Sequence, residues 1–224
     1  VIVPAYGWRA VANAPKFMKL QVEYCDIDDT GNIDIQDMIS KIEVFKPKAI
    51  LVVHNFGTLV DVSQLTDICA KYNVAIIEDA APSFTMGEPY SYQLGSYSDA
   101  VCFSFDFTKS PGCLGAGGAL ATNDKLLKDR IKSICSHTTN NLGIGTKSYL
   151  DTVSAAVLNK DIELINKNNY RQRRVDIATY YINNLPYKTL SGENYIYHRF
   201  IILTDRNKKQ KVIDLKLTPY GEEL

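Results

Sequence analysis

The sequence predicts an α/β protein, with a mainly parallel sheet that carries helices on both faces. Up to residue 125, short apolar runs alternate with segments whose apolar side chains recur at helical spacing. This alternation is typical of parallel strands joined by helices. The chain has 224 residues, 46% apolar and 22% charged, which suits one sizeable α/β domain and part of a second.

The expected elements follow one another closely. Strands are expected at Val1–Pro4, Leu20–Tyr24, Ala49–Val53, Val74–Ile77, Ala100–Phe105 and Gly118–Ala121. Helices are expected at Ile35–Phe45, Val62–Tyr72 and Asn123–Ser136, the last capped by Asn123 or Asp124. Ligands of such sheets bind beyond the carboxyl ends of the strands. The sequence therefore points to His54, Asp79 and the Ser104–Lys109 loop, which all follow strands.

The C-terminal part has a different pattern. Ser148–Leu185 is expected to be a long helical stretch, kinked or broken, which Pro186 ends. A strand is expected at Tyr195–Thr204. We therefore divide the chain into a large domain, residues 1–147, and a long helix with part of a small α+β domain, residues 148–224. Both ends of the sequence look cut.

Charge and cysteine content exclude several classes of protein. Lys+Arg and Asp+Glu both total 25, so no basic excess favours nucleic acid or an anionic membrane surface. No apolar run reaches the roughly 20 residues of a membrane span, and no signal peptide is visible. The five cysteines lack C-x-x-C spacing, so we expect reduced, mostly buried thiols, no metal site and a cytoplasmic location.

A lysine and an acid at strand ends carry the main chemical signal. Lys109 lies five residues after Ser104, and Asp79 ends an apolar strand about thirty residues earlier. A lysine amine forms a Schiff base with the aldehyde of pyridoxal phosphate (PLP), and a carboxylate keeps the pyridine nitrogen protonated. A lone lysine in a loop is usually a surface residue. The glycine-rich run that follows, Ser110–Gly118, instead favours close packing around a buried group.

Other residues near these strand ends fit the same chemistry. Ser104 and Thr108 carry hydroxyls of the kind that bind phosphate. Trp8, the only tryptophan, follows the first strand and has a face that suits stacking on a pyridine ring, although tryptophan is more often part of a core. His54 alone is better explained as a hydrogen-bonded structural histidine.

Together these residues resemble the DegT/DnrJ/EryC1/StrS family, the PLP-dependent sugar aminotransferases of fold type I. The resemblance covers nearly the whole chain and depends on the order and spacing of several short motifs. They are Val3–Asn13, Asn32–Asp34, Val53–Gly57, Ile77–Ala81, Gly95–Asp99, Phe103–Lys109, Gly115–Gly118, Thr122–Asp124 and Tyr149–Ala156.

The resemblance implies a role for each matching residue. Lys109 corresponds to the Schiff-base lysine and Asp79 to the partner of the pyridine nitrogen. The resemblance implies that these two residues are catalytic. Ser104 corresponds to a phosphate ligand and Trp8 to the aromatic residue that stacks on the cofactor. The implied reaction moves an amino group from an amino acid, usually glutamate, to a keto sugar attached to a nucleotide. The implied assembly is a homodimer with shared active sites.

Some positions depart from the family pattern. Pro82 stands where Gln or His is common, and it has no side-chain hydrogen bond to offer. Lys147 and Tyr149 stand where the family often has Asn and Arg, although Lys147 remains able to meet a phosphate as a point charge. The Gly-Thr segment that helps to hold the phosphate would precede Val1.

Two alternatives therefore remain open from the sequence. One is a truncated or degenerate relative without catalysis, which acts as a binding or scaffold protein. The other is a nucleotide-binding α/β protein without PLP, but the first strand is not followed by G-x-G-x-x-G and there is no Walker lysine. Lys109 itself argues against the dehydratases of the family, which the resemblance implies have His at that position.

Overall fold

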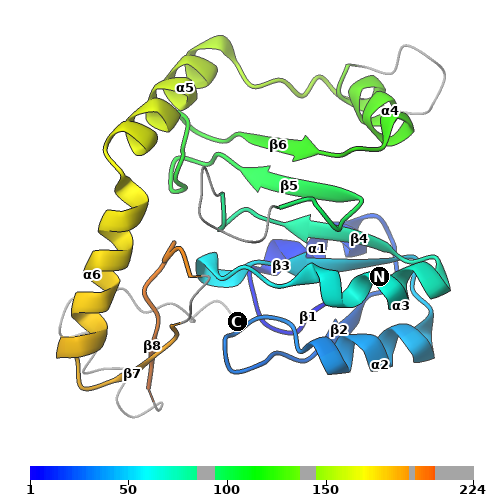
Figure 1. Ribbon diagram of the computed structural model, residues 1–224. Helices are drawn as coiled ribbons and strands as arrows, with labels where there is room; N and C mark the ends of the chain where they lie inside the picture. Colours follow the sequence, from blue (N-terminus) through cyan, green and yellow to red (C-terminus); the bar gives the residue numbers. More distant parts are fainter. Residues whose placement is uncertain (85–93, 137–144, 192–194, 205–224) are drawn as a thin grey trace.

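The computed structural model describes residues 1–84, 94–136, 145–191 and 195–204, and it contains a six-stranded sheet in the order β2-β1-β3-β4-β5-β6 (Figure 1). The strands are β1 (Ile2–Pro4), β2 (Glu23–Cys25), β3 (Ala49–Val53), β4 (Ala75–Asp79), β5 (Ala100–Ser104) and β6 (Gly118–Ala121). The first five run parallel, and β6 lies antiparallel to β5 at the edge. The predicted mainly parallel α/β fold is confirmed.

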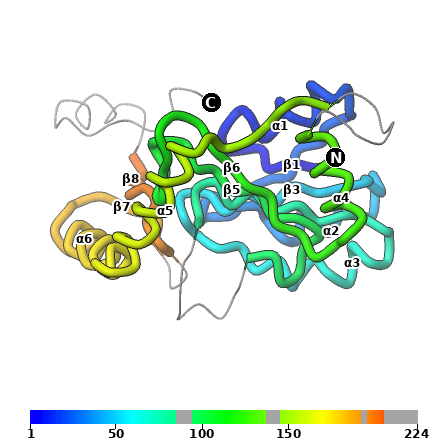
Figure 2. The backbone as a smooth tube through the Cα atoms, turned by 90° about the horizontal axis from the view of Figure 1, so that it is seen from above, coloured from blue at the N-terminus to red at the C-terminus, as the bar shows by residue number. Residues whose placement is uncertain are grey.

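Helices cover both faces of the sheet, but they bury them unequally (Figure 2). Helix α1 (Arg9–Phe17) lies on one face, and α2 (Ile35–Phe45) and α3 (Thr66–Tyr72) lie on the other. The α2–α3 face holds the main core. Its fully buried side chains include Met38, Ile42, Ile50, Val52, Val62 and Leu65. On the α1 face the buried cluster is small and consists of Val3, Val11 and Val53.

Side-chain caps fix several helix starts. Asp34 caps α2, because its carboxylate accepts a hydrogen bond from Asp37 N at 2.9 Å. Asp124 caps α4 (Lys125–Cys135) through Leu126 N at 2.7 Å and Leu127 N at 3.1 Å. This geometry decides between the two caps that the sequence left open.

Two expected elements need correction in the first half of the chain, and one helix there was not expected. The segment Val62–Tyr72 is not one helix, because a 3₁₀ turn, η2 (Val62–Leu65), precedes α3. The second strand is Glu23–Cys25 and not Leu20–Tyr24. A left-handed turn at Lys19 (φ 59°) changes the direction of the chain, so that pairing with β1 starts only at Glu23. Helix α1 was not expected, and its interior Pro15 is a weak signal for a helix.

The predicted helical stretch Ser148–Leu185 forms two helices, as a break in it was expected. These are α5 (Thr152–Lys167) and α6 (Tyr170–Asn184), separated by a left-handed residue, Asn169 (φ 49°). A small antiparallel sheet follows, made of β7 (Lys188–Thr189) and β8 (Ile202–Leu203).

The predicted strand Tyr195–Thr204 is wrong over most of its length. Only Ile202–Leu203 is strand, because Tyr197 takes a left-handed conformation (φ 49°). The segment before it crosses to the end of β3 instead. Ile196 N donates to Gly57 O at 2.8 Å, and Arg199 N donates to Phe56 O at 3.3 Å. This crossing brings C-terminal residues to the carboxyl edge of the sheet (Figure 1).

Within the described ranges, no helix is both long and apolar enough to cross a membrane. The same ranges hold no cluster of three or more His, Cys, Asp or Glu side chains suited to a metal ion. All five cysteines have free thiols, and Cys25, Cys69 and Cys113 are buried, as the sequence predicted for most of them. Burial is the main cause that raises the pKa of the Cys25 thiol to about 12, so this thiol stays protonated at neutral pH.

Candidate functional site

Several of the predicted site residues lie at the carboxyl edge of the sheet, on its α1 face. Asp79 ends β4 and lies opposite Cys102 in β5. Side chains alternate between the two faces of a strand, so Ser104, two residues after Cys102, shares the face of Asp79. Trp8 precedes α1, the helix that covers this face. Three segments distant in sequence therefore converge on one side of the sheet.

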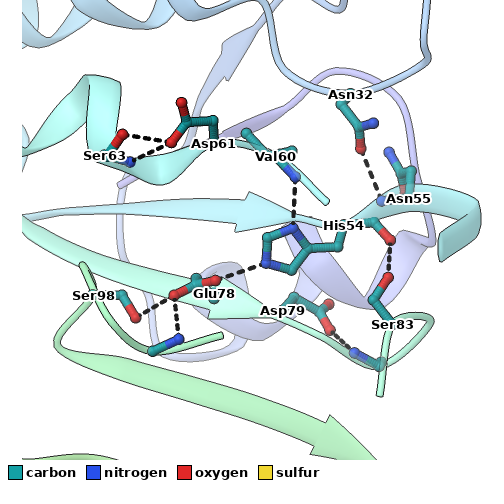
Figure 3. Close-up of polar contacts among 12 residues, drawn as sticks. Asn32, His54, Asn55, Val60, Asp61, Ser63, Glu78, Asp79, Ser83 and Ser98 are labelled. Carbon is teal, nitrogen blue, oxygen red and sulfur yellow. Dashed lines mark hydrogen bonds and ion pairs between the residues drawn. The ribbon is translucent and has the colours of Figure 1, made fainter. Parts of the chain in front are cut away.

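Asp79 is a half-buried carboxyl group with a defined orientation. Its Oδ1 accepts a hydrogen bond from Ala81 N at 2.9 Å, in the turn that follows β4 (Figure 3). Burial raises the pKa of this carboxyl, and it outweighs the Ala81 hydrogen bond and the nearby positive charge of Lys109, which lower the pKa. The carboxyl of Asp79 is therefore less acidic than that of an exposed aspartate.

Lys109 is half buried and lies within electrostatic reach of Asp79. Burial lowers the pKa of the Lys109 amine, and the positive charge of Arg199 lowers it further. The carboxylates of Asp79 and Asp106 raise it and so oppose that shift. A larger share of this amine is uncharged at neutral pH than in an exposed lysine, and the uncharged amine is the nucleophilic form.

The loop that carries Lys109 is tied to its surroundings at several points. Lys109 N donates to Asp106 O at 2.8 Å, and Gly112 N donates to Asp161 Oδ2 of α5 at 2.9 Å. A Cβ at Gly112 would lie 2.9 Å from Lys109 O, so the turn has no room for a side chain. The close glycine packing that the sequence suggested is present here.

Basic residues of the C-terminal half lie near Lys109, and sequence reasoning missed them. His198 and Arg199 lie within electrostatic reach of Lys109, and Arg174 of α6 lies within electrostatic reach of His198. Burial and the charges of Lys109, Arg199 and Arg174 lower the pKa of His198 to about 3, so the imidazole is neutral at pH 7. The only signal in the sequence was the His-Arg pair itself, inside a segment that was expected to be a plain strand.

The remaining predicted residues differ in how firmly the structure connects them to Lys109. Ser104 lies at the end of β5, where its hydroxyl accepts a 3.4 Å hydrogen bond from Asp106 N. The Thr108 hydroxyl donates to Asp106 Oδ1 at 2.6 Å, which keeps it at the loop surface. Trp8 is 59% exposed. Lys147 is exposed, and its ammonium lies 5.5 Å from the ring centre of Tyr149, away from these contacts.

His54 is a fully buried, hydrogen-bonded residue, in agreement with the structural role expected for it. Its Nε2 lies 2.8 Å from Glu78 Oε2, and its Nδ1 lies 3.0 Å from Val60 N (Figure 3). Glu78 precedes Asp79 in β4, so its side chain points to the opposite face of the sheet.

Comparison with known proteins identifies the family of the chain. The sequence matches the DegT/DnrJ/EryC1/StrS aminotransferase family over residues 1–217. It is 35% identical over 170 residues to the UDP-2-acetamido-2-deoxy-3-oxo-D-glucuronate aminotransferase of Pseudomonas aeruginosa, covering 73% of this chain and 46% of that protein. It is also 35% identical over 185 residues to the dTDP-3-amino-3,6-dideoxy-alpha-D-galactopyranose transaminase of Aneurinibacillus thermoaerophilus, covering 78% and 50%.

Among solved structures, the chain is similar to NtdA of Bacillus subtilis with bound cofactor PMP. The TM-score is 0.82 at 26% identity, over 95% of this chain and 51% of that one. The chain thus spans about half the length of these relatives. The match over residues 1–217, together with the shared fold, shows that the chain belongs to the DegT/DnrJ/EryC1/StrS aminotransferase family.

Proposed function

We propose that the chain carries the cofactor-binding part of a PLP-dependent aminotransferase. The enzyme would transfer an amino group from an amino acid, glutamate being the expected donor, to a keto sugar attached to a nucleotide. The observation that carries the proposal is the half-buried Lys109 amine within electrostatic reach of the Asp79 carboxylate, at the carboxyl edge of a parallel sheet. The sugar-nucleotide substrate follows from the UDP- and dTDP-linked names of the two relatives.

The residues present fit PLP. An amine with a lowered pKa suits the aldehyde, and a carboxylate suits a protonated ring nitrogen. The Ser104 hydroxyl at the end of β5 suits the phosphate. PMP, which the B. subtilis relative holds, is the amine form of the same cofactor. When bound, PLP supplies an aldehyde for amine exchange and a ring that accepts an electron pair.

Each residue has a task that follows from its position. Lys109 Nζ would hold the cofactor covalently and, once the amino donor displaces it, would move a proton from the α-carbon of the donor to the cofactor carbon that receives the amine. The Asp79 carboxylate, oriented by Ala81 N at 2.9 Å, would keep a proton on the ring nitrogen. Trp8, which is 59% exposed, would be available to stack on the ring face.

The basic cluster near Lys109 suits anionic groups. Arg199 adds positive charge near Lys109, and Arg174 adds it near His198. The acids that act on Lys109 are Asp79 and Asp106. Phosphate and the carboxylates of the amino donor are the anions in this reaction. We further propose a cytoplasmic homodimer, in which Lys147 reaches a phosphate in the partner's site from its exposed position.

The competing reading is a relative without catalysis. Pro82, in the turn after Asp79, favours it, because this position offers no side-chain hydrogen bond to a ring substituent. Binding of PLP by the chain separates the two readings.

The test is covalent trapping. The purified chain is mixed with PLP, reduced with borohydride and digested, and we expect mass spectrometry to find the cofactor on Lys109. Lys109→Ala should remove this adduct. The matched control is Lys71→Ala, since Lys71 is a fully exposed lysine of α3 whose pKa is raised by Tyr72. Modification spread over surface lysines, with Lys109 spared, would refute the proposal for this chain.

A further inference from the structure

A buried hydrogen-bonded pair, His54 and Glu78, lies on the face of the sheet opposite to Asp79. The side chains of His54 and Glu78 are both 0% exposed, and their Nε2 and Oε2 atoms are 2.8 Å apart (Figure 3). Their surroundings on this face are the apolar side chains of the main core, such as Val52 and Ile76. Burying polar side chains in such a place costs free energy that hydrogen bonds only offset. A carboxylate here is therefore poorly explained by stability.

The hydrogen bonds define which ring nitrogen of His54 carries the proton. Val60 N–H donates to Nδ1 at 3.0 Å, so Nδ1 has no proton. The proton is then on Nε2, which donates to Glu78 Oε2. On its other oxygen, Oε1, Glu78 accepts from Gly95 N at 3.0 Å and from the Ser98 hydroxyl. The Nε2 proton of His54 thus points at Glu78, and both oxygens of Glu78 accept hydrogen bonds.

Backbone contacts connect this pair to Asp79. His54 N donates to Asp79 O at 3.1 Å, and the Ser83 hydroxyl donates to His54 O at 2.7 Å. The residue that orients the Asp79 carboxylate, Ala81, lies between these two contacts in the chain. The backbone of His54 therefore contacts both the last peptide of β4 and the turn after it, while the His54 side chain is fixed by Glu78 and Val60 N.

We propose that Glu78 and His54 are positioning residues, which fix the Asp79 carboxylate by holding the end of β4 from the opposite face of the sheet. The purpose of this positioning rests on the proposed aminotransferase function, because a ring nitrogen needs its carboxylate at a fixed place. The positioning itself is a property of the chain without cofactor.

The variant Glu78→Gln tests the pair with almost no change in volume. If the amide NH₂ of the variant faces His54, this donor meets the proton on Nε2. If that proton moves to Nδ1 instead, the Nδ1 proton meets the N–H of Val60. If the NH₂ faces the other side, it meets Gly95 N–H. Every arrangement leaves two donors in conflict, so the network cannot be rebuilt.

Amide hydrogen exchange at Ala81 reads the position of the Asp79 carboxylate directly, because that amide donates to Asp79 Oδ1. We expect Glu78→Gln to speed this exchange by about 10-fold to 100-fold, the scale of a lost hydrogen bond to a charged group. The matched control is Asp99→Asn. Asp99 Oδ2 accepts from Ile76 N at 2.7 Å, in the amino half of the same strand, so exchange at Ala81 should stay within about twofold.

Nitrogen NMR of the unaltered chain provides a second readout that needs no variant. We expect His54 to show a proton on Nε2 and none on Nδ1. A proton on Nδ1, or on both nitrogens, would overturn the proposal. Should Glu78→Gln fail to fold, Ser98→Ala removes one donor to Glu78 and should speed Ala81 exchange less. Unchanged exchange in the folded variants would also overturn the proposal.

Affinity for added PLP completes the experiment and separates the two proposals. We expect Glu78→Gln to weaken PLP binding by about tenfold or more, with Asp99→Asn unaffected. If the unaltered chain binds no PLP, the proposed function fails, while the NMR and exchange results still decide the positioning role. If PLP binds equally well to the chain and to Glu78→Gln, the positioning role fails alone.

Discussion

The two faces of the sheet differ in how completely helices bury their side chains; we call the α2–α3 face the closed face and the α1 face the open face. On the α2–α3 face, Met38, Ile42 and Leu65 are fully buried, and the Glu78 carboxylate there accepts hydrogen bonds from several donors. On the α1 face the buried cluster is small, Trp8 is largely exposed, and Asp79 and Lys109 are half buried. The closed face supplies stability, while the open face keeps its polar groups accessible for chemistry. Changes on the two faces should therefore have different consequences.

The largest expected effect is loss of turnover on the open face. Asp79→Asn should leave the fold nearly intact, yet slow amine exchange with glutamate by about 100-fold or more, because the ring loses the partner that keeps it protonated. The measurement is the rate of the spectral change when glutamate is added to the PLP-loaded protein. Asp67→Asn, in the first turn of α3, is the control. Near-normal rates in Asp79→Asn would contradict the assigned role.

The closed face should respond through stability instead. Leu65→Ala removes a fully buried side chain and should lower the free energy of unfolding by about 2–5 kcal/mol. Val11→Ala, in the small cluster of the α1 face, should cost less because fewer buried neighbours surround it. Denaturant unfolding measures both. PLP affinity of folded Leu65→Ala should stay within about twofold, and a tenfold loss would mean that the faces are not separable.

The smallest expected effect concerns Trp8, an exposed residue of the open face. Trp8→Ala should change the free energy of unfolding by less than about 0.5 kcal/mol, since the side chain is 59% exposed. It should still weaken PLP binding by about 3-fold to 10-fold through the lost stacking. The control is Phe17→Ala at the end of the same helix, where the side chain is 87% exposed. Equal PLP affinity in both variants would remove Trp8 from the site.

Much of the fold was predictable because local signals agreed with it. Helix Ile35–Phe45 has the bounds that its apolar spacing indicated, and it starts at a capping aspartate. The strands β3, β4 and β5 were visible as apolar runs, since they are buried between neighbours. Helix α1 was missed because its interior Pro15 argues against a helix, although the residues around Pro15 are amphipathic.

The candidate site was predictable where it depends on strand ends, and not where it depends on tertiary contacts. Asp79, Ser104 and Lys109 follow apolar strands, so their convergence was inferred from the topology of parallel sheets. His198 and Arg199 reach the site only because Tyr197 turns left-handed and the segment pairs with the residues after β3. Nothing in the local sequence specifies that crossing. The roles of Trp8 and Lys147 stay predictions.

The adjacency of Glu78 and Asp79 sets a rule for length changes in β4. A deletion or insertion of one residue within the strand would exchange the two acids between the faces, because side chains alternate with a period of two. The longer acid would then meet the cofactor and the shorter one would fall short of the imidazole. Homologous chains that keep this chemistry should therefore tolerate insertions and deletions of any length in the loops. Within this strand they should tolerate only changes of an even number of residues.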